Sequence, residues 1–337
     1  MKKIIVTGGS GYVAEWVISD LLNHDYRVHA SLRSVQKEAR VRTAISSLVD
    51  TEKMKQLSFF QADLTRANGW ANEMVGADSV FHIASPLGTG TETEAELVSI
   101  AKNGTLNVLR GAKIAGVKRI IMISSQAAAT ARRSVGKLKL DDNYWTDMSN
   151  PELVPYYISK VEAEKAAWKF AKQNGLDLTT LLPGGIFGPL LDSHVQSSNA
   201  LVSELIKMSL VPKANIEVTD VRDLAAAMRL ALNTPAAINK RYNVGTTPTT
   251  FLKIVHTFQQ DGIRSKKITL AIPNGVVKFA SKFQPSLRQL LPQLGVKYWH
   301  DSTRAHDELH WHNRCWQETM KDSATSLKDW GIIKTRR

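Results

Sequence analysis

Tyr156 and Lys160 are the residues of this sequence best suited to proton chemistry. Residues 156–173 have the apolar spacing of a helix, and a separation of four places both side chains on one face, one turn apart. A cationic amine beside a phenol favours the phenolate, which makes the tyrosine a usable proton donor near neutral pH. Tyr157 is adjacent but lies three residues before Lys160, and we expect it to be a packing residue.

A pair of serines follows a predicted strand. Residues 119–124 are a nearly continuous apolar run, typical of a buried strand, which delivers Ser124 and Ser125 to its carboxyl end. A serine hydroxyl at that place can hydrogen-bond a substrate oxygen as negative charge develops on it. Together with Tyr156 and Lys160, this hydroxyl predicts proton transfer to a substrate oxygen.

A glycine-rich turn opens the chain. A β-branched run at residues 2–7 leads into Thr7-Gly8-Gly9-Ser10-Gly11, and a helical pattern follows over residues 12–24. Strand, glycine turn and helix in this order are typical of dinucleotide binding, because the free N–H groups and the dipole of the helix N-terminus favour the pyrophosphate. The candidate cofactor-binding residues of this turn are Thr7, Gly8, Gly11, Tyr12 and Val13.

The second predicted strand indicates which dinucleotide binds. NAD enzymes usually carry an acidic residue at the end of this strand for the ribose 2′-hydroxyl, whereas residues 28–33 contain no acid and end in Arg33. An arginine there accommodates a 2′-phosphate through charge-assisted hydrogen bonds. We therefore expect NADPH as the cofactor, Arg33 as the main contact, and Lys37 or Arg40 as a secondary one. Cells commonly keep NADP reduced, so the expected direction is carbonyl reduction.

Predicted strands alternate with predicted helices over the first half of the chain. This alternation predicts an α/β fold, a doubly wound parallel sheet of the Rossmann type with helices on both faces. The strands are expected at 2–7, 26–32, 57–62, 79–84, 119–124 and 177–182, and the helices at 12–24, 37–49, 66–75, 92–115 and 156–173.

The alternation breaks after Pro189. A helix is expected near 198–209, and another opens at Asp220 to Leu224. We expect residues 1–189, with about 215–250, to form the NADP-binding domain. Residues 190–214 and 251–337 are expected to form a smaller, mostly helical cap over the carboxyl ends of the strands, where ligands bind in open sheets.

Composition excludes several classes of protein. The 337 residues carry a net charge of +13, but the basic residues are scattered without an aromatic-basic stripe, so no nucleic acid partner is expected. No apolar run approaches about 20 residues, which excludes a membrane span. The single cysteine, Cys315, fits a reducing cytoplasm. His306 and His310 have a spacing that can bind zinc, but we expect a surface helix there and no metal.

Several short motifs carry a family resemblance over about residues 3–235. The segments TGGSGYVA, SS and YYISK resemble those of the extended short-chain dehydrogenases/reductases. The branch of dihydroflavonol reductases, cinnamoyl-CoA reductases and aldehyde reductases is similar in further segments, namely Val80 to Pro86, Asn103 to Thr105, Trp145 to Asp147, Ala163 to Trp168 and Leu182 to Pro189.

The resemblance implies roles for individual residues. Tyr156 would be the general acid, Lys160 would tune it and hold the nicotinamide ribose, and Ser125 would orient the carbonyl, since the catalytic serine of the family is usually the second of the pair. The remaining implied cofactor contacts are Asp63 and Leu64 at the adenine, Ala84, Ser85 and Pro86 along its path, and Pro183, Gly184 and Ile186 beside the nicotinamide.

Two departures from the family pattern concern the substrate pocket. Gln126 stands where many relatives have a small residue, so a narrower or more polar pocket is expected beside the carbonyl. Gly184 and Gly185 replace bulkier residues, which is expected to widen the site. His194 follows the nicotinamide loop and is a weaker candidate for substrate contact.

Three functions remain open. The favoured one is an NADPH-dependent carbonyl reductase for an aldehyde or ketone, active as a monomer or a homodimer. A nucleotide-sugar epimerase or dehydratase with retained NAD would keep the fold, but Arg33 speaks against it. A non-catalytic, NADP-sensing regulator is the third, and the presence of Tyr156 and Lys160 speaks against it.

Overall fold

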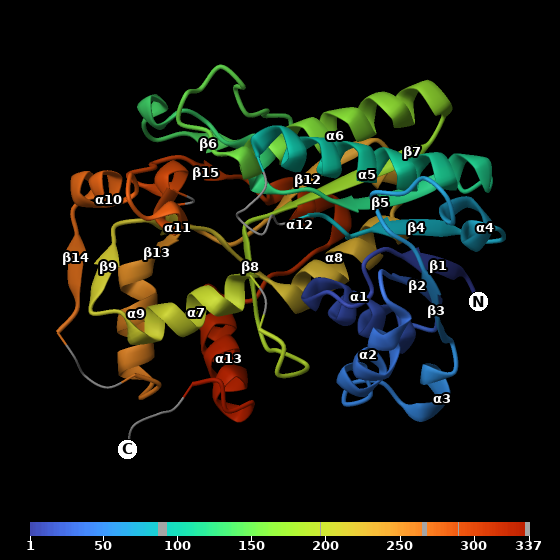
Figure 1. The fold of residues 1–337 in the computed structure, drawn as a ribbon, viewed down its shortest axis with the longest axis horizontal. Helices are drawn as coiled ribbons and strands as arrows, with labels where there is room; N and C mark the ends of the chain where they lie inside the picture. Colours follow the sequence, from blue (N-terminus) through green and yellow to red (C-terminus); the bar gives the residue numbers. More distant parts are fainter. Residues whose placement is uncertain (87–92, 196, 265–267, 289, 334–337) are drawn as a thin grey trace.

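Runs of branched apolar residues build the central sheet of the protein. The computed structural model describes residues 1–86, 93–195, 197–264, 268–288 and 290–333. Within these ranges the sheet has seven strands, and every neighbouring pair is parallel. Their spatial order is β12 (Lys240–Val244), β7 (Asp177–Pro183), β5 (Arg119–Ile123), β4 (Ser79–His82), β1 (Lys3–Val6), β2 (Arg27–Leu32) and β3 (Leu57–Gln61) (Figure 1).

Helices cover both faces of this sheet, which confirms the predicted doubly wound α/β class. One face packs against α1 (Tyr12–Asn23), α2 (Glu38–Ile45) and α8 (Val221–Asn233), and the opposite face against α4 (Trp70–Met74), α5 (Glu94–Ile114) and α6 (Pro155–Asn174). In Figure 1, α5 and α6 lie above the sheet and α1 and α8 below it. The short helices α3 (Thr51–Met54) and α12 (Thr303–Leu309) lie against α1 and α8, respectively.

The sheet order places a crevice beside β1. Val6, the last residue of β1, is in register with Ala30 of β2 on one side and with Phe81 of β4 on the other. The chain crosses to β2 and β3 in one direction and to β4 and β5 in the other, so the connections diverge at the carboxyl end of β1. Open α/β sheets bind their ligands at such a point.

Most predicted elements are present within a few residues of their expected bounds, but two helices are shorter. The expected helix at 37–49 is a short 3₁₀ turn, η1 (Val35–Lys37), followed by α2, and the one at 66–75 is α4 alone. Gly69 precedes α4 with φ +95°, a left-handed conformation that ends any earlier helical turn. Residue 92, the first of the expected helix at 92–115, lies outside the described residues.

The strand β12 was missed by sequence reasoning. Its five residues, KRYNV, begin with two cations and do not read as a buried strand. Arg241 is nevertheless buried, because its guanidinium forms an ion pair with the buried Glu164 of α6 at 2.8 Å. A long-range charge pair thus permits a strand that local pattern does not indicate.

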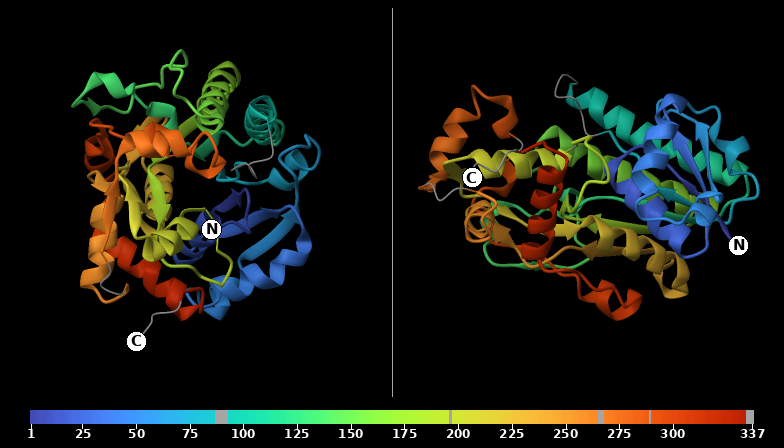
Figure 2. Two further views of the ribbon diagram at one scale, coloured as in Figure 1. Left: turned by 60° about the vertical axis from the view of Figure 1, so that its left-hand side comes forward. Right: turned by 90° about the horizontal axis from the view of Figure 1, so that it is seen from below.

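A second group of elements covers the carboxyl ends of the strands. It is built on α7 (Ser197–Lys207), α9 (Phe251–Gln260) and α13 (Trp316–Asp329), whose apolar faces form a second core together with Tyr12, Phe187 and Val221. Figure 2 shows these yellow, orange and red segments at the opposite end of the molecule from the blue N-terminal strands. The smaller members are α10 (Asn274–Ala280), α11 (Pro285–Arg288), η5 (Leu291–Gln293), β9 (Leu210–Pro212) and β14 (Leu270–Ile272).

Three short strand pairs connect this group to the sheet. They are β6 (Lys139–Leu140) with β15 (Trp299–His300), β8 (Gly185–Phe187) with β11 (Val218–Asp220), and β10 (Asn215–Ile216) with β13 (Thr249–Thr250). The remaining 3₁₀ turns are η2 (Gln126–Ala129), η3 (Arg133–Val135) and η4 (Pro235–Ala237).

The structure also bears on membrane and metal binding. In the described ranges, every helix is too short or too polar to traverse a bilayer. Helix α12 ends at Leu309, and His310 follows in a left-handed conformation. His306 and His310 therefore do not lie on one face of a continuous helix. Among the described residues, no cluster of three or more side chains could hold a metal ion.

Candidate active site

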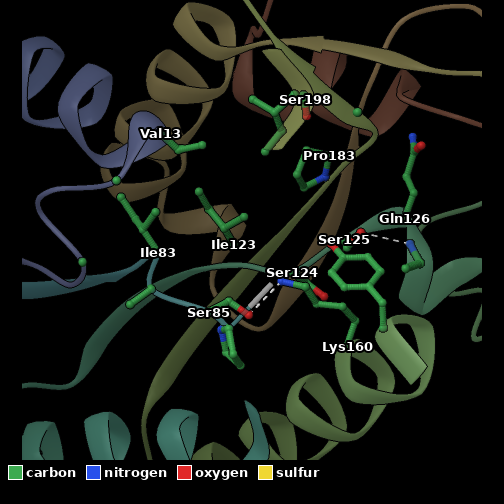
Figure 3. A pocket seen from close by; sticks show the side chains of 18 of the residues that line it. Val13, Ile83, Ser85, Ile123, Ser124, Ser125, Gln126, Lys160, Pro183 and Ser198 are labelled. Carbon is green, nitrogen blue, oxygen red and sulfur yellow. Dashed lines mark hydrogen bonds between the residues drawn. The ribbon is translucent and has the colours of Figure 1, made fainter. Parts of the chain in front are cut away.

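A cavity of about 660 Å³ lies at the carboxyl ends of the strands, between the sheet and the cap. Its wall includes the glycine turn, the ends of β4 and β5, the start of α6 and the loop after β7. Figure 3 shows Val13, Ile83, Ser125, Lys160 and Pro183 around this space. Residues far apart in the sequence therefore meet at one place.

The glycine turn is held in a shape that suits a pyrophosphate. Gly8 has φ +74°, and its N–H donates to the hydroxyl of Ser31 on β2 at 2.9 Å. A Cβ atom at Gly8 would lie 3.0 Å from the Cβ of Ala84, so a larger residue would push the turn away from β4. Among the described side chains, none caps α1 at Gly11, which leaves first-turn amides available to an anion.

Thr7 lies behind this turn and does not line the cavity. Its hydroxyl oxygen accepts hydrogen bonds from the backbone N–H groups of Ile83 and Ala84, each at 3.0 Å, and shares a third with Nδ1 of His82. Burial and the nearby charge of Lys160 lower the pKa of His82 to about 3, so this imidazole is neutral. The Thr7 hydroxyl thus fixes the segment that follows β4, and a direct contact of Thr7 with the cofactor stays a prediction.

Two of the three expected cations line the end of the cavity beside β2. Arg33 and Lys37 line the cavity and are exposed. Arg40 does not line it, because its guanidinium is held by the carboxylates of Glu15, at 2.9 Å, and Asp192. These contacts hold the guanidinium outside the cavity wall and favour Lys37 over Arg40 as the secondary contact, while a contact of Arg40 with the cofactor stays a prediction.

Asp63 and Leu64 also line this end of the cavity. The Asp63 carboxylate accepts hydrogen bonds from the N–H and the hydroxyl of Thr65, both at 2.8 Å. These bonds, with smaller contributions from Arg33 and Arg66, lower the pKa of Asp63 below its usual range. Asp63 is therefore ionised at neutral pH and forms a fixed turn beside the cavity.

Helix α6 presents Tyr156 and Lys160 to the cavity. Pro155 begins the helix, a position where its missing N–H costs nothing. The Nζ atom of the buried Lys160 lies 5.5 Å from the centroid of the Tyr156 ring and donates a hydrogen bond to the hydroxyl of Ser85 at 3.0 Å. The lysine is thus oriented by the segment that follows β4 and lies beside the phenol, as the spacing of four predicts.

The structure separates the roles of the two serines at the end of β5. Ser124 is buried, and its hydroxyl donates to Oε2 of Glu164 at 2.6 Å. The hydroxyl oxygen of Ser125 accepts from the N–H of Ala127 at 3.1 Å, which leaves the Ser125 hydrogen free to donate into the cavity (Figure 3). Of the two, Ser125 is the one able to hydrogen-bond a substrate oxygen.

Tyr157 both packs against Tyr156 and forms part of the cavity wall. The two rings meet edge to face, with centroids 6.1 Å apart. Burial raises the pKa of Tyr157 to about 12, so it keeps its proton at all physiological pH values. The sequence-based expectation of a packing residue covers only one of these two roles.

Gln126 belongs to a group of polar side chains in the cavity wall. Its other two members, Glu217 and His300, were not expected from the sequence. The amide of Gln126 donates to Oε2 of Glu217 at 3.1 Å, and Nδ1 of His300 lies 2.9 Å from Oε1 of the same carboxylate. All three residues line the cavity, whereas His194 does not. No local signal marks Glu217 or His300, because the pairing of β15 with β6 brings His300 here from the far end of the chain.

The two glycines after Pro183 do not serve to widen the cavity, which corrects that expectation. A Cβ atom at Gly184 would lie 2.2 Å from the carbonyl oxygen of Glu217. At Gly185 it would lie 2.7 Å from the Phe187 ring. The backbone of Glu217 leaves no room for a side chain at Gly184, and the side chains of Phe187 and Ile216 crowd Gly185, so the glycines permit close packing rather than enlarge the pocket.

Comparisons with known proteins assign the chain to a family. The profile of the NAD dependent epimerase/dehydratase family matches residues 4–245. The chain belongs to this family. The match confirms the resemblance to extended short-chain dehydrogenases/reductases seen in the motifs, and it covers all of the central sheet except Lys3.

Relatives within this family include plant reductases. An anthocyanidin reductase of Vitis vinifera is 36% identical over 213 residues, which cover 61% of this chain and 62% of the relative. The cinnamoyl-CoA reductase CAD2 of Medicago truncatula is 34% identical over 242 residues, 69% of this chain and 73% of the relative. The matched stretch thus spans less than two thirds of the Vitis vinifera enzyme.

A solved structure shares the fold over almost the whole chain. The yeast methylglyoxal/isovaleraldehyde reductase Gre2, complexed with NADPH, superposes with a TM-score of 0.81 at 23% identity, covering 98% of this chain and 100% of that one. At this identity the likeness shows the fold alone.

Proposed function

We propose that the protein is an NADPH-dependent reductase of an aldehyde or ketone. The observation that carries the proposal is that Tyr156, Lys160 and Ser125 line the same cavity as the glycine turn. The plant relatives are named as reductases, which supports the reaction type, and the Gre2 structure shows that this fold can hold NADPH. The retained Tyr156 and Lys160 favour catalysis over a purely regulatory role.

Each of the three residues has a distinct task in carbonyl reduction. The Ser125 hydroxyl donates a hydrogen bond to the carbonyl oxygen and holds it against the Tyr156 phenol. NADPH, when bound, supplies the hydride that adds to the carbonyl carbon. The Tyr156 hydroxyl gives its proton to the oxygen as the carbon–oxygen double bond becomes single, and the Lys160 ammonium stabilises the phenolate that remains.

The residues proposed to hold the cofactor follow the cavity wall from one end to the other. Arg33, supported by Lys37, would bind the 2′-phosphate, because both cations face the cavity mouth without an acid on β2. The other proposed contacts are Gly8, Gly11, Tyr12, Val13, Asp63, Leu64, Ala84, Ser85, Pro86, Tyr156, Lys160, Pro183, Gly184 and Ile186, all of which line the cavity.

The proposal extends to organisation and partners. Residues 1–189 with about 215–250 would bind the cofactor, and 190–214 with 251–337 would form the substrate cap, whose helices α7, α9 and α13 pack in one core. The partner would be a small carbonyl compound rather than nucleic acid, because the basic residues are scattered along the chain. A cytoplasmic location, suggested by the lone Cys315, and a monomeric or homodimeric state complete the proposal.

The first test measures NADPH consumption by the purified protein against aldehydes, α-dicarbonyls and aryl ketones. We expect turnover with NADPH, and we expect Tyr156→Phe to lower kcat by about 10² to 10⁴-fold because the general acid is lost. NADPH binding, followed by its fluorescence, should remain, since the phenyl ring keeps the same volume. A Tyr26→Phe variant is the control, because it removes a phenol hydroxyl that lies outside the cavity wall, and it should keep most of the activity.

Other outcomes would favour the two alternatives. NADPH binding with no turnover across the panel would favour the NADP-sensing regulator. NAD that stays bound through purification, together with conversion of a nucleotide sugar, would favour the epimerase. Full activity of Tyr156→Phe would overturn the proposed role of the phenol.

A further inference from the structure

The most heavily hydrogen-bonded carboxylate near the site belongs to Glu164. It lies on α6 one turn beyond Lys160, is fully buried, and does not line the cavity. It therefore cannot touch the substrate or the cofactor. A buried carboxylate is costly unless it is paired and hydrogen-bonded, so its partners indicate what it does.

Donors from four elements converge on this carboxylate. They are the Ser124 hydroxyl at the end of β5 (2.6 Å), the Thr180 hydroxyl on β7 (2.7 Å), the Trp168 indole on α6 (3.1 Å) and the Arg241 guanidinium on β12 (2.8 and 3.1 Å). Arg241 is held in turn by the carbonyl oxygens of Asp142 and Tyr144 and lies 3.8 Å from the Trp145 ring centroid. The charge of Glu164 is thus neutralised within a rigid frame.

One of these bonds connects the two elements that carry the proposed catalytic residues. Ser124 precedes Ser125 on an extended backbone, with φ −165° and ψ 151° at Ser125, so consecutive side chains point to opposite sides. Both serines line the cavity, but the Ser124 hydroxyl is bound to Glu164 of α6, whereas the Ser125 hydroxyl keeps its hydrogen free to donate into the cavity (Figure 3). On the same helix, Tyr156 lies two turns before Glu164, and Lys160 lies one turn before it.

We propose that Glu164 is a positioning residue, which binds the Ser124 hydroxyl and thereby fixes Ser125 relative to Tyr156 and Lys160. This inference rests on the proposed reductase function. The physical reason is that a carbonyl oxygen must lie within hydrogen-bond reach of both Ser125 and Tyr156, and a displacement of about 1 Å can lower a rate by about 10²-fold. A single charge-assisted bond spanning β5 and α6 controls that separation.

The test compares Ser124→Ala with Thr180→Val. Each variant removes one buried hydroxyl that donates to Glu164 at nearly the same distance, and each leaves the ion pair with Arg241 in place. Thr180 carries no adjacent catalytic residue. Direct substitution of Glu164 is avoided because it would leave the buried Arg241 unpaired and endanger folding.

We expect both variants to lose similar thermal stability but to differ in catalysis. Ser124→Ala should lower kcat by about tenfold, with the KM for NADPH within about twofold of the wild-type value, whereas Thr180→Val should keep its kcat within about twofold. The isotope effect from NADPH deuterated at the transferred hydrogen should increase in Ser124→Ala, because chemistry becomes slower than the other steps. Equal kcat values in the two variants would overturn the inference.

A double-mutant cycle separates positioning from a general structural effect. If Ser124 acts through Ser125, adding Ser124→Ala to a Ser125→Ala background should change kcat by less than about twofold. The same tenfold loss in both backgrounds would contradict the proposal. Failure of the wild-type protein to turn over any carbonyl would overturn the reductase function itself, a result visible before any variant is compared.

Discussion

At the scale of residues, neighbouring side chains of the same type have different partners. Ser124 and Ser125 are adjacent and both line the cavity, yet the Ser124 hydroxyl donates to Glu164 whereas the Ser125 hydroxyl oxygen accepts from the N–H of Ala127. Arg33 and Arg40 are both cations after β2, yet Arg40 is held by two carboxylates while Arg33 lines the cavity mouth. The chemistry available to each residue depends on its partners rather than on its type.

This difference leads to a prediction on cofactor choice. Arg33→Ala should raise the KM for NADPH by about tenfold or more, because a charge-assisted bond to the 2′-phosphate is lost. The KM for NADH, which lacks that phosphate, should change by less than about twofold. Steady-state kinetics with both cofactors gives the two values.

Arg66→Ala is the matched control for Arg33→Ala. Arg66 is an exposed arginine near Asp63 that does not line the cavity, so its removal changes the net charge equally. It should leave both KM values nearly unchanged. Equal losses in the two variants would show that the overall charge, rather than Arg33, attracts NADPH.

At the scale of elements, close approach between strands shapes the substrate end of the site. The pairing of β8 with β11 places the backbone of Glu217 directly against Gly184, and the carbonyl of Glu217 accepts from the N–H of Gly185 at 2.8 Å. The same segment carries the Glu217 side chain into the cavity, where it meets Gln126 and His300. The geometry of one short strand pair therefore positions part of the pocket wall.

Gly184→Ala tests this close approach. Its Cβ atom would lie 2.2 Å from a backbone oxygen, so a strand must move, and we expect a loss of about 2–4 kcal/mol in the free energy of unfolding. Gly275→Ala is the control, because its Cβ would meet no heavy atom within 4 Å. Urea unfolding of both variants gives the comparison. Equal stability of Gly184→Ala and the wild-type protein would contradict the assigned role.

At the scale of the whole molecule, several hydrophobic cores surround the cavity, and Val13, Trp16 and Ile186 pack against two of them. One core fills each face of the sheet, and a third fills the cap. The imidazole of His82 hydrogen-bonds the hydroxyls of Thr7 and Thr105, and all three side chains are buried. Protonation of His82 is therefore coupled to the stability of the entire fold.

The stability should fall in acid partly because of His82. Its pKa is lowered to about 3 in the folded protein and is 6.5 when unperturbed, so its stabilising contribution is complete above about pH 6.5 and is lost as the pH falls toward 3. Between pH 7 and pH 5 the loss from this residue should be about 2 kcal/mol. Urea unfolding of the wild-type protein and His82→Gln at both pH values measures it. An equally large pH effect in the variant would show that other groups are responsible.

Local sequence determined the framework of this protein. The apolar runs of β1 to β5 and β7, the glycine turn and the spacing of Tyr156 and Lys160 could be recognised because each depends on neighbouring residues, through strand periodicity, the backbone freedom of glycine and the helical repeat. All expected site residues except Thr7 and Arg40 line the cavity. They do so because the elements that carry them meet at one edge of the sheet.

Tertiary structure alone decided the remaining features. The strand β12 forms because Arg241 reaches Glu164, 77 residues earlier in the chain, and His300 enters the site because it meets Glu217 across 83 residues. The partners of Arg40 and Ser124 likewise lie on other elements, at Asp192 and Glu164. No periodicity or short motif specifies these long-range contacts. They depend on how complete helices and strands pack and on the free-energy cost of a buried charge without a partner.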